Sequence, residues 1–178
     1  MSIRIRYMTT VIEMTVLVLL FAGVAAAQSP SASTAPGSAR THRALGYIFA
    51  APGVYIGNVD SVATLHLGGG AEALIYRGLG IGAEIGVIGA LQESRGGMGL
   101  FSVNGSYHFE QKGKISPFLT GGYSVVGGRG IRNLVNFGGG VNYWLREGKG
   151  IRLEFRDHFY MDGSGRQLLG FRIGFVFR

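Results

Sequence analysis

Alternation between apolar and polar residues dominates the chain after Arg43. Between Phe101 and Glu110 the odd positions are aromatic, aliphatic or glycine and the even positions are polar. The same period of two returns between Ile151 and Phe159, where Asp157 is the one misfit on the apolar face. A period of two places successive side chains on opposite faces of a sheet. The pattern therefore predicts strands with one apolar and one polar face.

Turn-forming residues divide this region into eight predicted strands. These run over Ala44 to Gly57, Ala63 to Tyr76, Leu79 to Leu91, Met98 to Glu110, Lys114 to Val126, Arg132 to Arg146, Gly150 to Met161 and Arg166 to Arg178. Most exceed the ~9 to 11 residues that a tilted strand needs to cross a membrane. Short connections such as Arg77-Gly78 predict a meander of hairpins, and no helical period is sustained that could supply parallel crossovers. The expected fold is all-β, an eight-stranded antiparallel up-and-down barrel formed by residues 44–178.

Alternation alone does not say which face points outward. A soluble barrel turns its apolar face inward, whereas a membrane barrel turns it toward lipid. Three features favour the membrane arrangement: a polar set that contains opposed charges, small residues that suit a narrow lumen, and aromatics near strand ends that would form an interfacial girdle. The glycines with lumen parity are Gly68, Gly70, Gly122, Gly138 and Gly140. The aromatics assigned to the girdle are Tyr47, Tyr55, Tyr107, Tyr123, Tyr143 and Phe159.

The first 43 residues differ from the rest. Basic residues Arg4 and Arg6, an apolar run over residues 16–22 and Ala25-Ala26-Ala27 have the layout of a secretory signal, with cleavage expected after Ala27. The apolar run is shorter than the ~20 residues of a spanning helix. Residues 28–43 are rich in Ser, Ala, Thr and Pro and predict a flexible leader. Export through the signal would place the barrel in the cell outer membrane of a Gram-negative-type bacterium.

Composition narrows the possible functions. The chain has 32 glycines and no cysteine, so a disulfide framework and a thiolate metal site are excluded. Its net charge of +7 comes from basic residues scattered along the chain rather than gathered in a stripe, which argues against nucleic-acid binding. Positive charge also suits contact with anionic headgroups or lipopolysaccharide phosphates. We expect outer-membrane lipid and lipopolysaccharide as partners.

Several segments carry a resemblance to a known family. These are Gly121-Gly122-Tyr123, the run from Asn136 to Trp144, the run from Leu153 to His158, and Gly170 to Gly174. In them the chain resembles the small outer-membrane β-barrels of the OmpA/OmpX-like class, over about Ala44 to Arg178. The resemblance implies insertion by the barrel-assembly machinery through an aromatic C-terminal strand, which here ends in Phe177-Arg178. We expect a monomer.

Charged residues of both signs share lumen parity in this register. They are Glu72, Glu84, Glu154, Arg146, Arg152, Arg156 and Arg172. Charges removed from bulk water are costly unless they are paired, so the first interpretation is a set of ion pairs that fills the lumen. The second is a gate in which Glu and Arg exchange partners to admit small ions, as the resemblance to small barrels permits.

The sequence gives little support for a catalytic site or a metal site. Outer-membrane lipid A deacylases place a serine two residues after a histidine, and the nearest string here has Tyr160 two residues after His158. Ser102, Ser106 and His108 share one strand face, but a polar lumen predicts the same residues without catalysis. The four histidines are far apart in sequence, so no metal and no cofactor are expected.

The sequence thus predicts an outer-membrane barrel with a structural or porin-like narrow-pore role and no enzyme activity. Two alternatives remain open at this stage. One is a soluble periplasmic barrel that binds an apolar ligand in its interior. The other is an outer-membrane enzyme that modifies lipid.

Overall fold

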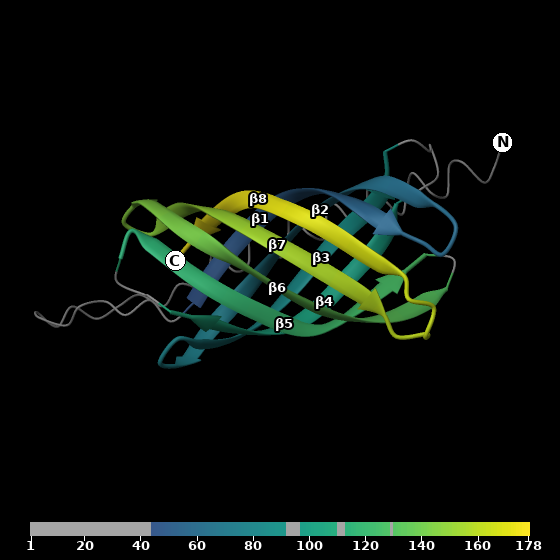
Figure 1. Ribbon diagram of the computed structural model, residues 1–178. Coiled ribbons are helices and arrows are strands. Elements are labelled where there is room, and N and C mark those ends of the chain that lie inside the picture. Colours follow the sequence, from purple (N-terminus) through teal and green to yellow (C-terminus); the bar gives the residue numbers. More distant parts are fainter. Residues whose placement is uncertain (1–43, 92–96, 110–112, 129) are drawn as a thin grey trace, which may run out of the picture.

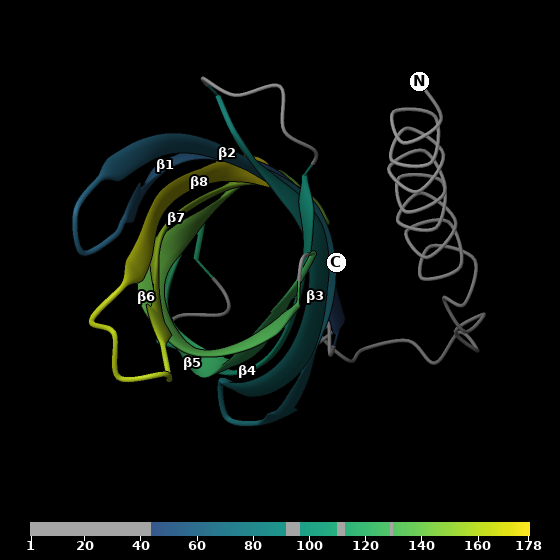
Figure 2. The same cartoon turned by 90° about the vertical axis from the view of Figure 1, so that its right-hand side faces the viewer.

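The computed structural model describes residues 44–91, 97–109, 113–128 and 130–178. The proposed signal and leader lie outside the described residues. Eight strands form β1 (Ala44–Ile56), β2 (Ser61–Tyr76), β3 (Leu79–Ala90), β4 (Met98–His108), β5 (Ile115–Gly127), β6 (Ile131–Arg146), β7 (Lys149–Tyr160) and β8 (Gln167–Phe177). Each strand pairs antiparallel with the next, and β8 pairs with β1 to close the ring (Figures 1 and 2). The predicted eight-stranded up-and-down barrel is confirmed, and its strand bounds differ from the predicted ones by at most two residues.

The two ends of the barrel differ in their connections. The turn end carries the connections from β2 to β3, β4 to β5 and β6 to β7 together with the C-terminus. The loop end carries the connections from β1 to β2, β3 to β4, β5 to β6 and β7 to β8. The tightest connection is Arg77-Gly78, where both residues have positive φ, 41° and 91°. Positive φ at both central residues is the geometry of a type I′ turn, which matches the twist of the strands it joins. Bulges that shift the register follow Leu74 in β2 and Trp144 in β6, both next to the turn end.

The apolar face points outward. Phe101, Phe155 and Ile173 expose 48%, 49% and 52% of their surface, whereas Ser102, Glu154 and Arg172 are buried inside the ring. A water-soluble barrel requires the opposite arrangement, because its exterior must be polar. The apolar ligand pocket of the soluble alternative is therefore absent from the described part of the barrel, whose interior is polar over its middle.

Two of the girdle assignments are wrong. Tyr107, Tyr123 and Tyr143 are exposed on the outer face as predicted, but Tyr47 is 4% exposed and points into the lumen, and Tyr55 packs against an interior apolar cluster. In β1 the odd-numbered residues face inward, so an aromatic at an odd position lies inside whatever its distance from the strand end.

Glycine makes room for the interior aromatics of β1. Tyr47 lies directly opposite Gly70, and Phe49 lies directly opposite Gly68. A Cβ at Gly70 would lie 2.8 Å from the Tyr47 hydroxyl, and one at Gly68 would lie 2.9 Å from the Phe49 ring. The glycines of β2 thus allow two large rings to lie across the inner wall of a narrow barrel.

An aromatic ring also packs onto a glycine on the outer face, where β8 closes the barrel. The Phe177 ring covers Gly46 of β1, where a Cβ would meet its Cε2 at 2.1 Å. Gly46 and Phe177 are paired in the register between β1 and β8. The last aromatic of the chain therefore packs directly onto the first strand at the point of closure.

Candidate functional site: a network of charges in the lumen

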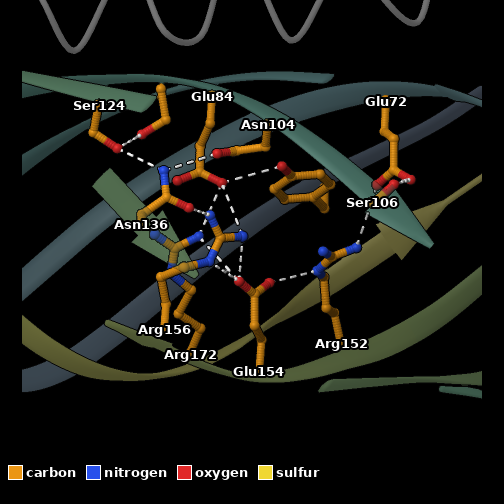
Figure 3. Close-up of polar contacts among 12 residues, drawn as sticks. Glu72, Glu84, Asn104, Ser106, Ser124, Asn136, Arg152, Glu154, Arg156 and Arg172 are labelled. Carbon is orange, nitrogen blue, oxygen red and sulfur yellow. Dashed lines mark hydrogen bonds and ion pairs between the residues drawn. The ribbon is translucent and has the colours of Figure 1, made fainter. Parts of the chain in front are cut away.

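Three arginines and three glutamates meet in the middle of the lumen. Arg152, Glu154 and Arg156 alternate along the inner face of β7, and Arg172 of β8 lies directly opposite Glu154. The three β7 residues are joined by two hydrogen bonds. Arg152 Nε donates to Glu154 Oε2 at 2.9 Å, and Arg156 Nε donates to Glu154 Oε1 at 2.5 Å. Glu154 thus accepts from both neighbours on its own strand (Figure 3).

Glu84 connects this group to the far side of the barrel. It lies on β3, and its Oε2 accepts from Arg172 Nη1 at 2.9 Å and from the Tyr47 hydroxyl at 3.1 Å. Arg172 Nη1 also lies 3.5 Å from Glu154 Oε1, so this guanidinium joins carboxylates on opposite walls. The network therefore braces β3 against β7 and β8 across the lumen.

Glu72 forms the end of the network nearest the turns. Its Oε1 binds His108 Nε2 at 2.6 Å and accepts the Ser106 hydroxyl, and its Oε2 lies 4.0 Å from Arg152 Nη1. Arg152 itself stacks on Phe118, with its guanidinium carbon 3.8 Å from the ring centroid. Ion pairing and stacking on an aromatic ring both offset the cost of removing the Arg152 guanidinium from water.

Neutral amides and hydroxyls extend the network toward β4 and β5. Arg156 Nη1 donates to Asn136 Oδ1 at 2.8 Å, and Asn136 Nδ2 donates to Asn104 Oδ1 at 3.0 Å and to Ser124 Oγ at 2.8 Å. Ser124 in turn bonds Ser102 at 2.8 Å. These side chains were not predicted as site residues, although their polar positions in the alternation of β4 and β6 were the signal that could have identified them.

Six of the seven charged residues assigned to the lumen lie in this network. Arg146 does not: it is exposed at the turn end of β6, beyond the bulge that follows Trp144. Strict alternation from Asn142 assigns Arg146 to the lumen. The bulge after Trp144 shifts the register before Arg146 is reached, so the alternation no longer applies there. The three arginines and three glutamates that remain balance one another in charge.

Buried apolar residues form a layer toward each end of the lumen. Leu45, Trp144 and Val176 pack together at the turn end, where the Arg178 guanidinium lies 4.1 Å from the Trp144 ring centroid. At the loop end five buried residues form a second cluster, namely Ile88, Leu100, Val126, Leu134 and Leu168. Most of the charged network therefore lies between these two apolar layers, which the strands themselves contribute.

Solved structures with the same architecture include outer-membrane proteins and a designed transmembrane barrel. Neisserial surface protein A matches with a TM-score of 0.62 at 13% identity, over 76% of this chain and 97% of that chain. The N-terminal β-barrel domain of Pseudomonas aeruginosa OprF matches with a TM-score of 0.57 at 17% identity, over 78% and 100%. A de novo designed transmembrane β-barrel matches with a TM-score of 0.51 at 15% identity, over 79% and 98%. This chain has the fold of small outer-membrane β-barrels.

The two sequence comparisons gave no match. No family model matches the chain, and no curated protein matches it. In the part that the structure describes, no helix is long and apolar enough to cross a membrane.

The residues considered for catalysis do not form a catalytic arrangement in this small outer-membrane barrel fold. Ser106 and His108 both bind Oε1 of Glu72, so the histidine is not placed to take the proton of the serine. His158 is 2% exposed and faces the lumen, away from the lipid-facing surface on which the deacylase motif operates. Among the described residues, no three His, Asp or Glu side chains are grouped to hold a metal ion.

One interior cavity lies beside the charged network. It has a volume of about 10 Å³ and lies between Thr64, His66, His158 and Arg172, beside Gly170. This is room for about one water molecule, far below the ~300 Å³ of a small-molecule site. This cavity is therefore too small to hold a small-molecule ligand.

Proposed function

We propose that the protein is an outer-membrane barrel with a closed lumen, which acts as a structural element and membrane anchor rather than as an open pore. One observation carries the proposal: a charge-balanced network fills the lumen between two apolar layers, while the outer face is apolar. A protein that spans a bilayer needs apolar side chains on its lipid-facing surface and needs its charged side chains to be paired in the interior. The barrel folds of the solved outer-membrane neighbours support this location.

The network suits a brace better than a gate. A gate needs two arrangements of similar free energy, but each carboxylate here already binds at least two partners from different elements. Removing one partner of a buried ion pair costs about 3 to 5 kcal/mol, so exchange of partners would pass through costly intermediates. An ion would also have to pass the apolar layers at both ends. We therefore expect conductance near the bilayer background.

Insertion is tested with spin labels on the refolded protein in vesicles. Single cysteines can be introduced at Phe101, Phe155 and Ile173 without interference, because the chain has no cysteine. Labels at these positions should be accessible to oxygen and protected from a water-soluble nickel chelate. A label at Val59, which is 92% exposed in a loop, is the aqueous control. Aqueous behaviour at all three strand positions would overturn membrane insertion.

Closure is tested with single-channel recording in planar bilayers. Wild-type protein should show no steady conductance, and Glu154→Gln should raise the frequency of brief openings because it removes the carboxylate that joins three arginines. Glu147→Gln, an exposed change in a turn, is the control. A steady wild-type conductance that changes with Glu154→Gln but not with Glu147→Gln would support the gate instead.

A further inference from the structure

An apolar hollow lies on the outer wall of the barrel. Its volume is about 420 Å³, and it spans β7, β8 and β1 close to the turn end. The side chains that line it from the outer face are Ile48, Ala50, Ile151, Ile173 and Phe175. Ile48, Phe175 and Ile151 are directly paired across the three strands, and the small Ala50 lies opposite Ile173 in the next row. The lining offers only hydrocarbon to an occupant.

Hydrocarbon alone does not select an occupant inside a membrane. The surrounding acyl tails are as apolar as the lining, so preference for one lipid has to come from the headgroup. Lys149 supplies such a contact. It is exposed, and it precedes Ile151 by two residues on β7, which places it on the same outer face about 7 Å nearer the turn end. The cross-strand partner of Lys149 on β6 is Arg146.

The charge of the whole turn end agrees with an anionic headgroup. Its exposed charged residues in the described chain are Arg77, Lys114, Arg146 and Lys149, with Glu147 as the one acid. At the loop end the charges of the described residues cancel, since the two acids Asp60 and Asp162 are matched in number by Arg132 and Arg166. Each basic residue near a membrane surface favours anionic lipid by about fivefold. Attraction to anionic headgroups is therefore concentrated at the turn end.

Aromatic residues place the turn end at a membrane–water boundary. Tyr76, Tyr107 and Tyr143 are all exposed on the outer face near the turns, and the Arg77 guanidinium lies 5.2 Å from the centroid of the Tyr76 ring. Tyrosine beside arginine or lysine is typical of residues that sit among lipid headgroups. The hollow therefore lies one to two residues below the headgroup layer, where the first carbons of an acyl chain would be.

We propose that the hollow and Lys149 together form a site for one anionic diacyl phospholipid. An acyl chain lies in the hollow over Ala50, and the phosphate contacts Lys149 with Arg146 beside it. Short turns face the periplasm in barrels of this kind, so the lipid belongs to the inner, phospholipid leaflet. The site rests on the proposed membrane insertion and adds a partner and a location to it.

The site is tested by native mass spectrometry of the refolded full-length barrel in detergent with equal amounts of phosphatidylglycerol and phosphatidylcholine. Wild type should retain phosphatidylglycerol in preference. Lys149→Gln should lower that preference about fivefold. Lys114→Gln makes the same charge change at the same end, just before β5 and on the side of β7 away from the hollow, and should alter the preference less than twofold. Ala50→Phe should reduce retention of both lipids, because it fills the hollow. Heat-modifiable migration on gels confirms that each variant is folded.

The outcomes separate the site from the proposed function. Equal effects of Lys149→Gln and Lys114→Gln would show diffuse charge attraction and overturn the site, as would full retention by Ala50→Phe. Preferential retention of lipid A over phosphatidylglycerol, lost in Lys149→Gln, would overturn the phospholipid assignment. Barrels that give lipid-accessible labels at Phe101 but no phosphatidylglycerol preference would refute the site alone. Aqueous labels at Phe101 would refute insertion itself.

Discussion

The Tyr47 hydroxyl donates a hydrogen bond to Oε2 of Glu84 across the lumen. Glu84 is 1% exposed, so the bond cannot be replaced by bulk water. Tyr47→Phe should therefore lower the free energy of unfolding by about 1.5 to 3 kcal/mol, the range for a hydrogen bond to a charged group. Guanidinium unfolding of the barrel in lipid vesicles measures the change. Tyr107→Phe, at an exposed outer position, should change stability by less than about 0.5 kcal/mol.

Glu154 joins the arginines of β7 and β8 and is the centre of the network. Glu154→Gln removes its charge while it keeps nearly the same shape, and it leaves three buried arginines with two carboxylates. The free energy of unfolding should fall by about 3 to 5 kcal/mol. The same equilibrium unfolding experiment measures this, with Glu147→Gln as the exposed control. A loss below about 1 kcal/mol would show that the arginines find other partners and that the network is not a brace.

Asp157 is the one acidic residue among the described lipid-facing positions within the strands. It is 5% exposed, and its Oδ1 has no hydrogen-bond partner in the described chain. A buried polar atom without a partner costs about 1 to 3 kcal/mol. Asp157→Leu should therefore stabilise the barrel by a similar amount, whereas Asp157→Asn keeps a polar group and should gain less. Destabilisation by Asp157→Leu would indicate that the carboxylate has a partner in the membrane.

Two glycines on the inner wall should respond differently to the same substitution. A Cβ at Gly138 would lie 2.2 Å from the backbone oxygen of Phe155, but the nearest atom to a Cβ at Gly170 is 3.8 Å away. Gly138→Ala should force β6 from β7 and cost about 1 to 3 kcal/mol or more. Gly170→Ala should be neutral or stabilise by up to about 1 kcal/mol, because alanine restricts the unfolded chain. Equal effects of the two changes would contradict the close approach of β6 to β7.

Asp162 lies outside the membrane-spanning strands, in the loop between β7 and β8. The hydroxyl and backbone N–H of Ser164 donate to its carboxylate, and Arg166 pairs with it, which lowers the pKa of Asp162 to about 2. Because this pKa is below the ordinary value of 3.8, the carboxylate stabilises the loop above about pH 4, and that contribution disappears as the pH falls through 2. Carbon NMR titration should show the midpoint near 2 in wild type and a higher midpoint in Ser164→Ala. An unchanged midpoint in the variant would exclude the serine as the cause.

Period-two alternation was sufficient to predict the barrel, because each strand of a meander pairs with its sequence neighbours and the register follows from short turns. It also identified Glu84, Glu154 and Arg172 as lumen residues, since parity is kept along an unbroken strand. The alternation gave the wrong face for Arg146, because a bulge precedes this residue at the end of β6. Tyr47 was assigned to the outer girdle because aromatics near strand ends are common at membrane interfaces, although its odd position in β1 indicates the lumen.

The contacts across the lumen were beyond prediction for a different reason. Arg172 and Glu84 are on strands that are not neighbours, and they meet only because eight strands close with a particular tilt and stagger. The alternation of each strand specifies a face but not the height at which a side chain meets the opposite wall. The apolar layers at the two ends depend on the same stagger, so the alternation of single strands could not predict them.

The packing of Phe177 on Gly46 has a consequence for biogenesis. Until the eleven residues of β8 are in place, both β1 and β7 present unpaired edges, and the network lacks Arg172. A chain truncated before Gln167 would have two unpaired strand edges and an apolar exterior. These conditions favour edge-to-edge aggregation. Synthesis from the N-terminus supplies β8 after the other seven strands. We therefore expect the partly made chain to be prone to misassembly until β8 is in place.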